Sequence, residues 1–200
     1  EGREDYLLRK KDIIEYWLNE LPGLTSALDA GGNDGTFSKL ISSSGTYVVT
    51  ADSDHFAINK LYEQATNNNN IHPLIIDFSN PSPYTGVNNK ERVSFLNRKH
   101  FDLVISLAFI HHLCIGKNIP FEFIAEMFKR LGKILIIEFI PKEDEKVQQM
   151  LQYRTDIYDW YIEENFRKQF EKFFVITERK EIGKSKRILY LMITNESNHS

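Results

Sequence analysis

The sequence has only one cysteine, Cys114, among its 200 residues, so an internal disulfide is excluded. It has no apolar run that approaches the roughly 20 residues of a membrane-spanning helix. Its net charge is small, −3 at pH 7, so the chain lacks the excess of positive charge that is typical of proteins that bind bulk nucleic acid. These absences leave a single domain of ordinary size, which we expect in the reducing environment of the cytoplasm.

The sequence also lacks an initiator methionine. It starts with the charged residues Glu1-Gly2-Arg3-Glu4-Asp5, which do not form a signal peptide. Such a start is compatible with a domain taken from a longer chain. In that case, we expect upstream residues to contribute to substrate binding.

What the chain does contain is an alternation of short apolar runs and amphipathic segments. We predict strands at 27–28, 47–51, 72–77, 101–108, 133–140, 174–179 and 187–194, and helices at 5–21, 36–41, 55–66, 90–99, 120–131, 144–152 and 163–173. The alternation predicts an α/β fold with a doubly wound, mostly parallel, seven-stranded sheet. The link 180–186 is too short for a parallel crossover, so the last two strands should form an antiparallel hairpin.

A glycine-rich turn follows the first strand. Gly31 and Gly35 come after Asp29, and a helix follows at once, which is the layout that lets a backbone approach a nucleotide-like ligand. The spacing is not that of a dinucleotide site, because Asn33 and Thr36 stand where glycines are needed. A carboxylate at Asp29 would repel a pyrophosphate and suits a cationic ligand better.

An acidic residue also ends the second strand. Asp52 lies about 20 residues after the glycine turn, where a carboxylate can accept hydrogen bonds from both ribose hydroxyls. Asp54 is a competitor for this role. We expect Asp54 or Ser53 to cap the following helix instead.

The pattern Asp29-x-Gly31-x-Asn33-x-Gly35, with Asp52, Asp77-Phe78 and the block Ser106–Leu113, resembles the class I S-adenosylmethionine (SAM) dependent methyltransferases over residues 24–194. The C-terminal hairpin separates that fold from the dinucleotide-binding folds. The resemblance implies SAM as cofactor and S-adenosylhomocysteine (SAH) as product. The residues that it assigns to the cofactor are Asp29, Gly31, Asn33, Gly35, Asp52, Asp77, Phe78 and Ser106.

Within that resemblance, Asp77 would accept from the adenine amino group and Phe78 would cover the ring. The resemblance covers the methyltransferase domain at 24–194 and implies that the N-terminal segment 1–23 forms a helix beside the cofactor pocket, although this helix could simply cover the sheet. Residues 195–200 are expected to form a disordered tail.

The candidates for catalysis lie at the carboxyl edge of the sheet, where ligands of such folds bind. His111 and His112 follow the fourth strand, and histidine is the usual base near neutral pH. They could instead pack locally and cap the next segment. Glu138 ends the fifth strand, where it would orient the acceptor, pair with a histidine or be a solvated strand end. The sequence shows no metal-ligand constellation.

The sequence predicts an enzyme that methylates an O or N atom of a small molecule or a polymer end. The alternative is a non-catalytic SAM-binding or scaffold domain of a larger protein.

Two further segments have two interpretations each. Tyr158, Trp160 and Tyr161 would wall the acceptor pocket or, more simply, fill a corner between helices. The basic run Arg9-Lys10-Lys11 would form a phosphate site or, as we expect, lie on a solvated face.

Overall fold

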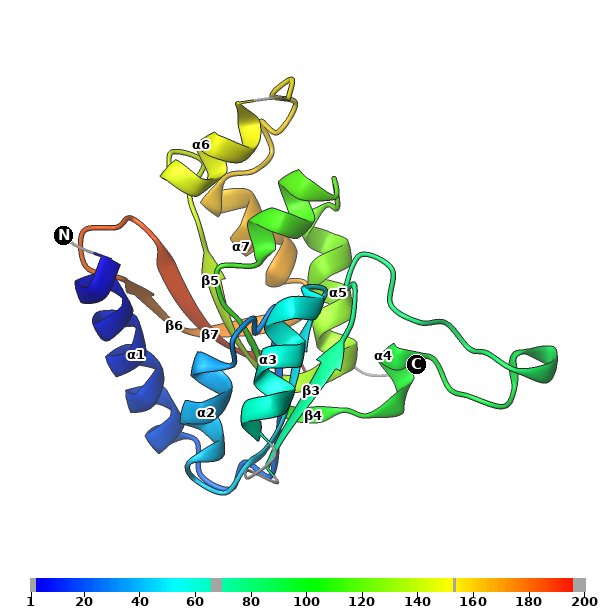
Figure 1. The fold of residues 1–200 in the computed structure, drawn as a ribbon. Helices are drawn as coiled ribbons and strands as arrows, with labels where there is room; N and C mark the ends of the chain where they lie inside the picture. Colours follow the sequence, from blue (N-terminus) through cyan, green and yellow to red (C-terminus); the bar gives the residue numbers. More distant parts are fainter. Residues whose placement is uncertain (1–2, 66–69, 153, 196–200) are drawn as a thin grey trace.

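The computed structural model describes residues 3–65, 70–152 and 154–195. Its centre is a seven-stranded sheet in the order β3-β2-β1-β4-β5-β7-β6 (Figure 1). The strands are β1 (Ser26–Ala30), β2 (Tyr47–Asp52), β3 (Ile71–Ile75), β4 (Phe101–Ser106), β5 (Gly132–Phe139), β6 (Phe174–Glu181) and β7 (Ile188–Thr194). The first five strands pair in parallel, and β7 is antiparallel to both of its neighbours. The predicted mostly parallel sheet with a C-terminal antiparallel hairpin is confirmed.

The central strands are apolar because helices cover both faces of the sheet. All five residues of β1 are buried, as are five of the six residues of β4, which is typical of parallel strands covered on both sides. The register pairs Ala30 with Ala51 and Ser106 with Ile137. The ends of β1, β2, β4 and β5 therefore meet at one edge of the sheet.

The helices form a layer on each face (Figure 1). They are α1 (Arg3–Glu20), α2 (Thr36–Ser42), α3 (His55–Ala65), α4 (Phe95–Arg98), α5 (Phe121–Leu131), α6 (Glu145–Leu151) and α7 (Glu163–Phe170). The buried Ile14 and Trp17 of α1 share one core cluster with Ile41 of α2. The opposite cluster contains the buried aromatic residues of α5 and α7.

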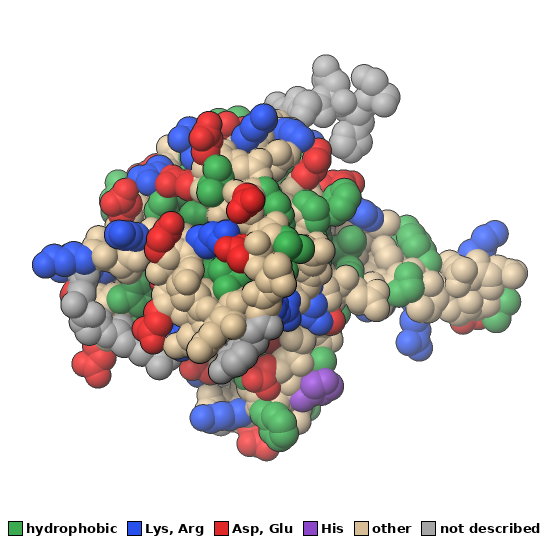
Figure 2. Space-filling view, turned by 90° about the horizontal axis from the view of Figure 1, so that it is seen from above, with side chains coloured by type: hydrophobic (Ala, Val, Ile, Leu, Met, Phe, Trp, Pro, Cys, Tyr) green, Lys and Arg blue, Asp and Glu red, His purple; other side chains and the backbone are tan. Residues whose placement is uncertain are grey.

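The segment before α4 differs from its prediction. Helix α4 begins only at Phe95, and Val93, which lies inside the predicted helix 90–99, is 45% exposed. The preceding residues form an arm that projects from the body, with an antiparallel bridge between Thr85 and Arg92 and left-handed backbone at Asn88 and Asn89 (Figures 1 and 2). Arg92 pairs in that bridge and Ser94 has extended backbone, with ψ 151°, so the helix predicted at 90–99 does not begin before Phe95.

The aromatic segment after α6 is structural. Tyr161 is fully buried, and its hydroxyl donates to the Ile140 carbonyl at 2.9 Å. The Tyr158 hydroxyl donates to the Ile115 carbonyl at 3.1 Å. These contacts support the corner interpretation for both tyrosines, because their polar ends are already occupied by the backbone.

A few predictions fall outside the described residues. They concern residues 1 and 2 of the N-terminal segment, Thr66, where a helix was expected to end, and the tail 196–200. Asn195, the first residue of the expected tail, donates its backbone N–H to the Phe173 carbonyl at 2.9 Å. No helix in the described ranges is long and apolar enough to cross a bilayer.

Candidate functional site

The glycine turn has the left-handed backbone that favours glycine, with φ of 76° at Gly31 and 70° at Gly35. A Cβ atom added to Gly31 would lie 2.5 Å from the ring of Phe109. Gly31 is therefore needed for the close approach of the loop that follows β4. The sequence did not indicate Phe109, because nothing local connects it to a residue 78 positions away.

Asp29 lies in the interior beneath this turn. It is 3% exposed and accepts a hydrogen bond from the Ser38 hydroxyl at 2.7 Å, which in turn accepts from the Thr50 hydroxyl at 2.6 Å. Burial raises the pKa of the Asp29 carboxyl to about 6, against the opposing effect of the Ser38 hydrogen bond. Gly32 leaves room for this carboxyl group, because a Cβ atom added to Gly32 would lie 2.8 Å from the carboxyl carbon of Asp29.

The carboxylate of Asp52 is held beside the glycine turn. Its Oδ2 accepts from the Asn33 backbone N–H at 3.0 Å, and its Oδ1 accepts from the Asp54 N–H at 2.9 Å. Asp54 accepts from the N–H groups of Phe56 and Ala57, which confirms it as the cap of α3. Each Asp52 oxygen keeps a free lone pair in this arrangement. The carboxylate is thus oriented before any ligand arrives.

Asp77 and Phe78 follow β3 in a tight turn. Asp77 accepts from the Ser79 N–H and hydroxyl, at 2.9 and 2.6 Å, and these bonds lower its pKa. Lys117 lies 3.6 Å from its other oxygen. The buried Phe78 ring meets the Phe109 ring edge-on, with centroids 5.7 Å apart. Phe78 also borders a cleft of about 350 Å³ between α4 and α5.

The loop after β4 carries both histidines. Ala108 has left-handed backbone, φ 49°, and its N–H donates to Oε2 of Glu138 at 2.8 Å. The His112 N–H then donates to the Phe109 carbonyl at 2.9 Å, which closes a turn. His111 is buried and His112 exposed, with ring centroids 4.2 Å apart. A short π-helix, His112–Gly116, follows. Such local irregularity is frequent at functional sites.

The surroundings of both histidines favour the neutral imidazole. Burial lowers the pKa of His111 to about 3, and the positive potential of nearby His112 and Arg187 adds to the effect. Nδ1 of His111 has no partner among the described residues. Partial loss of water also lowers the pKa of His112, while the Asp52 carboxylate opposes that shift. Both imidazoles are therefore neutral near pH 7.

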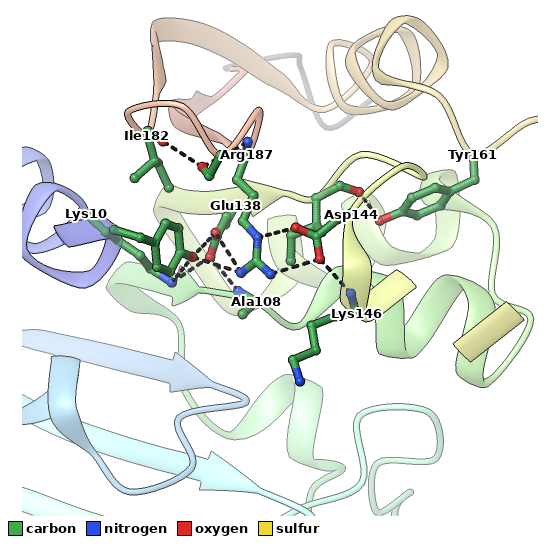
Figure 3. A network of polar contacts seen from close by, with 11 residues as sticks. Lys10, Ala108, Glu138, Asp144, Lys146, Tyr161, Ile182 and Arg187 are labelled. Atoms are coloured by element: carbon green, nitrogen blue, oxygen red, sulfur yellow. Dashed lines mark hydrogen bonds and ion pairs between the residues drawn. The ribbon is translucent and has the colours of Figure 1, made fainter. Parts of the chain in front are cut away.

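Glu138 is not solvated, and its partners within the described residues do not include a histidine, so two of its three sequence interpretations are wrong. It is 0% exposed, and Lys10 of α1 lies 2.6 Å from its Oε2 (Figure 3). The Tyr6 hydroxyl donates to Oε1. Lys10 is 3% exposed, so its predicted position on a solvated face is also wrong. A buried cation needs a partner, and Glu138 supplies one.

Arg187 extends the network toward α6 (Figure 3). Its guanidinium donates two hydrogen bonds to Asp144, at 2.7 and 2.9 Å, and one to Tyr6 at 3.1 Å. Desolvation of Asp144 is outweighed by these bonds, so its pKa is lowered. Sequence reasoning missed Tyr6, Lys10, Asp144 and Arg187. No local pattern marks them, since the partners are 43 to 181 positions apart.

The side chains of Ser106 and Cys114 both lie in the interior of the protein. Ser106 ends β4 in the interior, and its hydroxyl has no partner among the described residues. Cys114 is buried, which raises its thiol pKa and makes it inert. Within the described ranges, no group of three or more His, Cys, Asp or Glu side chains is arranged to hold a metal ion.

A comparison with protein-family profiles gives no match. Among curated proteins, the chain is 35% identical over 171 residues to the nodulation protein NoeA of Rhizobium meliloti (strain 1021). The match covers 84% of this chain and 36% of that protein, so the chain spans about a third of its relative's length.

Among solved structures, the chain is similar to magnesium protoporphyrin IX methyltransferase from Synechocystis PCC 6803 with bound SAH. The TM-score is 0.64 at 19% identity, over 98% of this chain and 90% of the other. The PH0226 protein of Pyrococcus horikoshii OT3 gives 0.68 at 16% identity, over 97% and 93%. The bifunctional kinase–methyltransferase WbdD gives 0.54 at 19%, over 96% and 39%. These likenesses establish the fold.

Proposed function

We propose that this chain, which has the fold of the class I methyltransferases, binds SAM and transfers its methyl group to an O or N atom of an acceptor. The acceptor's lone pair would attack the sulfonium methyl carbon, the S–CH₃ bond would break, and SAH would leave. The protein's part is to align the two reactants, exclude water and, for a protonated acceptor, receive the proton. Structures of this fold with bound SAM and SAH support the choice of cofactor.

Asp52 is the observation that carries the proposal. Two backbone N–H groups fix its carboxylate beside the glycine turn. We infer that its free lone pairs accept hydrogen bonds from the two ribose hydroxyls, Asp77 and Phe78 hold the adenine, and Asp29, with Gly31, Asn33 and Gly35, faces the amino-acid end. Ser106 would contribute its unpartnered hydroxyl from the end of β4.

On the acceptor side, the two histidines would have different tasks. His112 is exposed and lies in the field of Asp52, so it is the better placed to receive a proton from the acceptor. His111 is buried with a pKa of about 3, which makes it a weak base and suits it to accept a hydrogen bond through Nδ1. Glu138 is occupied by Lys10 and does not face the acceptor as a base.

The test is a calorimetric titration of the domain and of Asp52→Ala with SAH. We expect an affinity loss of about 100-fold, because two charge-assisted hydrogen bonds of roughly 1.5 kcal/mol each are removed. Asp54→Asn is the matched control. It retains a helix cap two residues further on, so its affinity should stay within about twofold of the unaltered chain.

Unchanged SAH affinity in Asp52→Ala would contradict the ribose assignment. An equal loss in Asp54→Asn would mean that the whole turn has collapsed, and the result would then say nothing specific about Asp52. The thermal unfolding of each variant, measured beside the titration, tells these two outcomes apart.

The rival proposal is a non-catalytic SAM-binding or scaffold domain. It is favoured by the chain's coverage of only 36% of its curated relative and by the engagement of Glu138 in an internal ion pair. Radiolabelled methyl transfer from SAM to a panel of hydroxyl, amine and carboxylate acceptors separates the two. Transfer by this domain alone would eliminate the rival.

A further inference from the structure

We propose that Glu138 is a positioning residue, whose carboxylate holds the Ala108 peptide in a left-handed turn and thereby fixes the loop that carries His111 and His112, while Lys10 holds that carboxylate from α1. This role rests on the proposed function, because the loop matters for methyl transfer only if its histidines face the acceptor. The placement of the loop itself can be measured without any acceptor.

The first step is the contact between Glu138 and the loop. Oε2 accepts from the Ala108 N–H at 2.8 Å and from Lys10 Nζ at 2.6 Å, so one oxygen joins β5, the loop and α1 (Figure 3). Both Glu138 and Lys10 are nearly inaccessible to water, with exposed fractions of 0% and 3%. Buried contacts of this kind are not exchanged for water, and they fix geometry more firmly than surface contacts.

The second step is the backbone of Ala108. A φ of 49° places an alanine in the left-handed region, which costs about 1–2 kcal/mol for a residue with a Cβ. Such a conformation persists only where the surroundings impose it. Among the described contacts, the Glu138 hydrogen bond is the one made by the Ala108 N–H itself.

The third step links the loop to the cofactor side. Phe109 follows Ala108 and packs over Gly31, whose missing Cβ leaves the ring its space. The Phe109 carbonyl accepts from the His112 N–H, so the direction of the Ala108 turn decides where His112 lies relative to Asp52. Lys10 also contacts the helix that follows the glycine turn, since its ammonium lies 5.1 Å from the Phe37 ring centroid of α2.

The experiment compares two double variants that leave no buried unpaired charge. Lys10→Met with Glu138→Gln keeps a side-chain oxygen for the Ala108 N–H. Lys10→Met with Glu138→Leu has similar volume but no acceptor. The readouts are the hydrogen exchange of the Ala108 amide and the NMR titration of the His112 ring, with and without SAH. Asp102→Asn is the control for general destabilisation, because Asp102 accepts from Thr25 and Ser26 at the opposite edge of the sheet.

We expect exchange of the Ala108 amide to be about tenfold faster in the Leu variant than in the Gln variant, as for the loss of one hydrogen bond. The response of the His112 titration to SAH should survive in the Gln variant and disappear in the Leu variant. Asp102→Asn should lower the unfolding temperature and leave both loop signals unchanged.

Equal exchange and equal His112 titration in the two double variants would overturn the positioning role. Failure of the proposed function looks different. The unaltered chain would then not bind SAH at all, while the exchange of Ala108 would still separate the Gln variant from the Leu variant.

Discussion

The two halves of the carboxyl edge are built in different ways. In the half around β1, β2 and β3, the carboxylates of Asp29, Asp52 and Asp77 accept hydrogen bonds from backbone N–H or hydroxyl groups at most 19 positions away. Asp52 accepts from Asn33 and Asp54, and Asp77 accepts from Ser79. In the half around β4, β5 and β7, the charged groups are held by one another across the fold, as in the pairs of Glu138 with Lys10 and of Arg187 with Asp144.

The two kinds of contact should respond differently to substitution. Asp52 and Asp77 can be altered with little effect on the rest of the chain, because their hydrogen-bond donors are backbone and hydroxyl groups near water. A buried ion pair cannot lose one member without leaving the other charge in the interior. The half around β1, β2 and β3 should therefore tolerate substitutions that the half around β4, β5 and β7 does not.

The largest expected effect is that of Glu138→Ala. It leaves the Lys10 ammonium buried without a carboxylate, and breaking such a pair costs about 3–5 kcal/mol in the free energy of unfolding. Denaturant unfolding of Glu138→Ala and of Asp52→Ala measures the contrast, and we expect about 1 kcal/mol or less for the latter. Equal losses in the two variants would remove the distinction between the halves.

The pH dependence of stability should reveal His111. Its pKa is lowered in the folded state, so the unfolded chain binds more protons and His111 costs stability as the pH falls below 6.5. The stability of His111→Gln relative to the unaltered chain should therefore rise by about 1.4 kcal/mol for each pH unit between about pH 6 and 4. Asp29, whose pKa is raised, acts with the opposite sign in this range, which is why the difference between the two proteins is the quantity to measure. A flat difference would mean that His111 is not buried as a neutral ring.

The smallest expected effect is the dependence of SAH affinity on the protonation of Asp29. Its carboxyl takes up a proton below about pH 6, and only the charged form attracts the amino group of SAH. SAH affinity should fall by about tenfold between pH 7 and pH 5, and this dependence should be weaker in Asp29→Asn. Calorimetry at the two pH values measures it. An identical pH dependence in the variant would assign the effect to another group.

The same contrast explains what the sequence could predict. Asp29, Gly31, Asp52 and the cap at Asp54 form short patterns at strand ends, and the fold brought them to one edge as expected. The mostly parallel sheet and its C-terminal hairpin followed from the alternation of elements and from one short link. Lys10, by contrast, belongs to a basic run that looks solvated, and only the packing of α1 against β5 gives it a partner. The need for Gly31 beneath Phe109 was likewise invisible, because it depends on a contact between the turn after β1 and the loop after β4.

The central claim is that the locally built half of the site binds SAM. A calorimetric titration of the unaltered domain with SAM, with SAH and with NAD tests it most directly. We predict saturable binding of SAM and SAH with a stoichiometry of one, and no binding of NAD. Binding of NAD, or of none of the three, would contradict the claim.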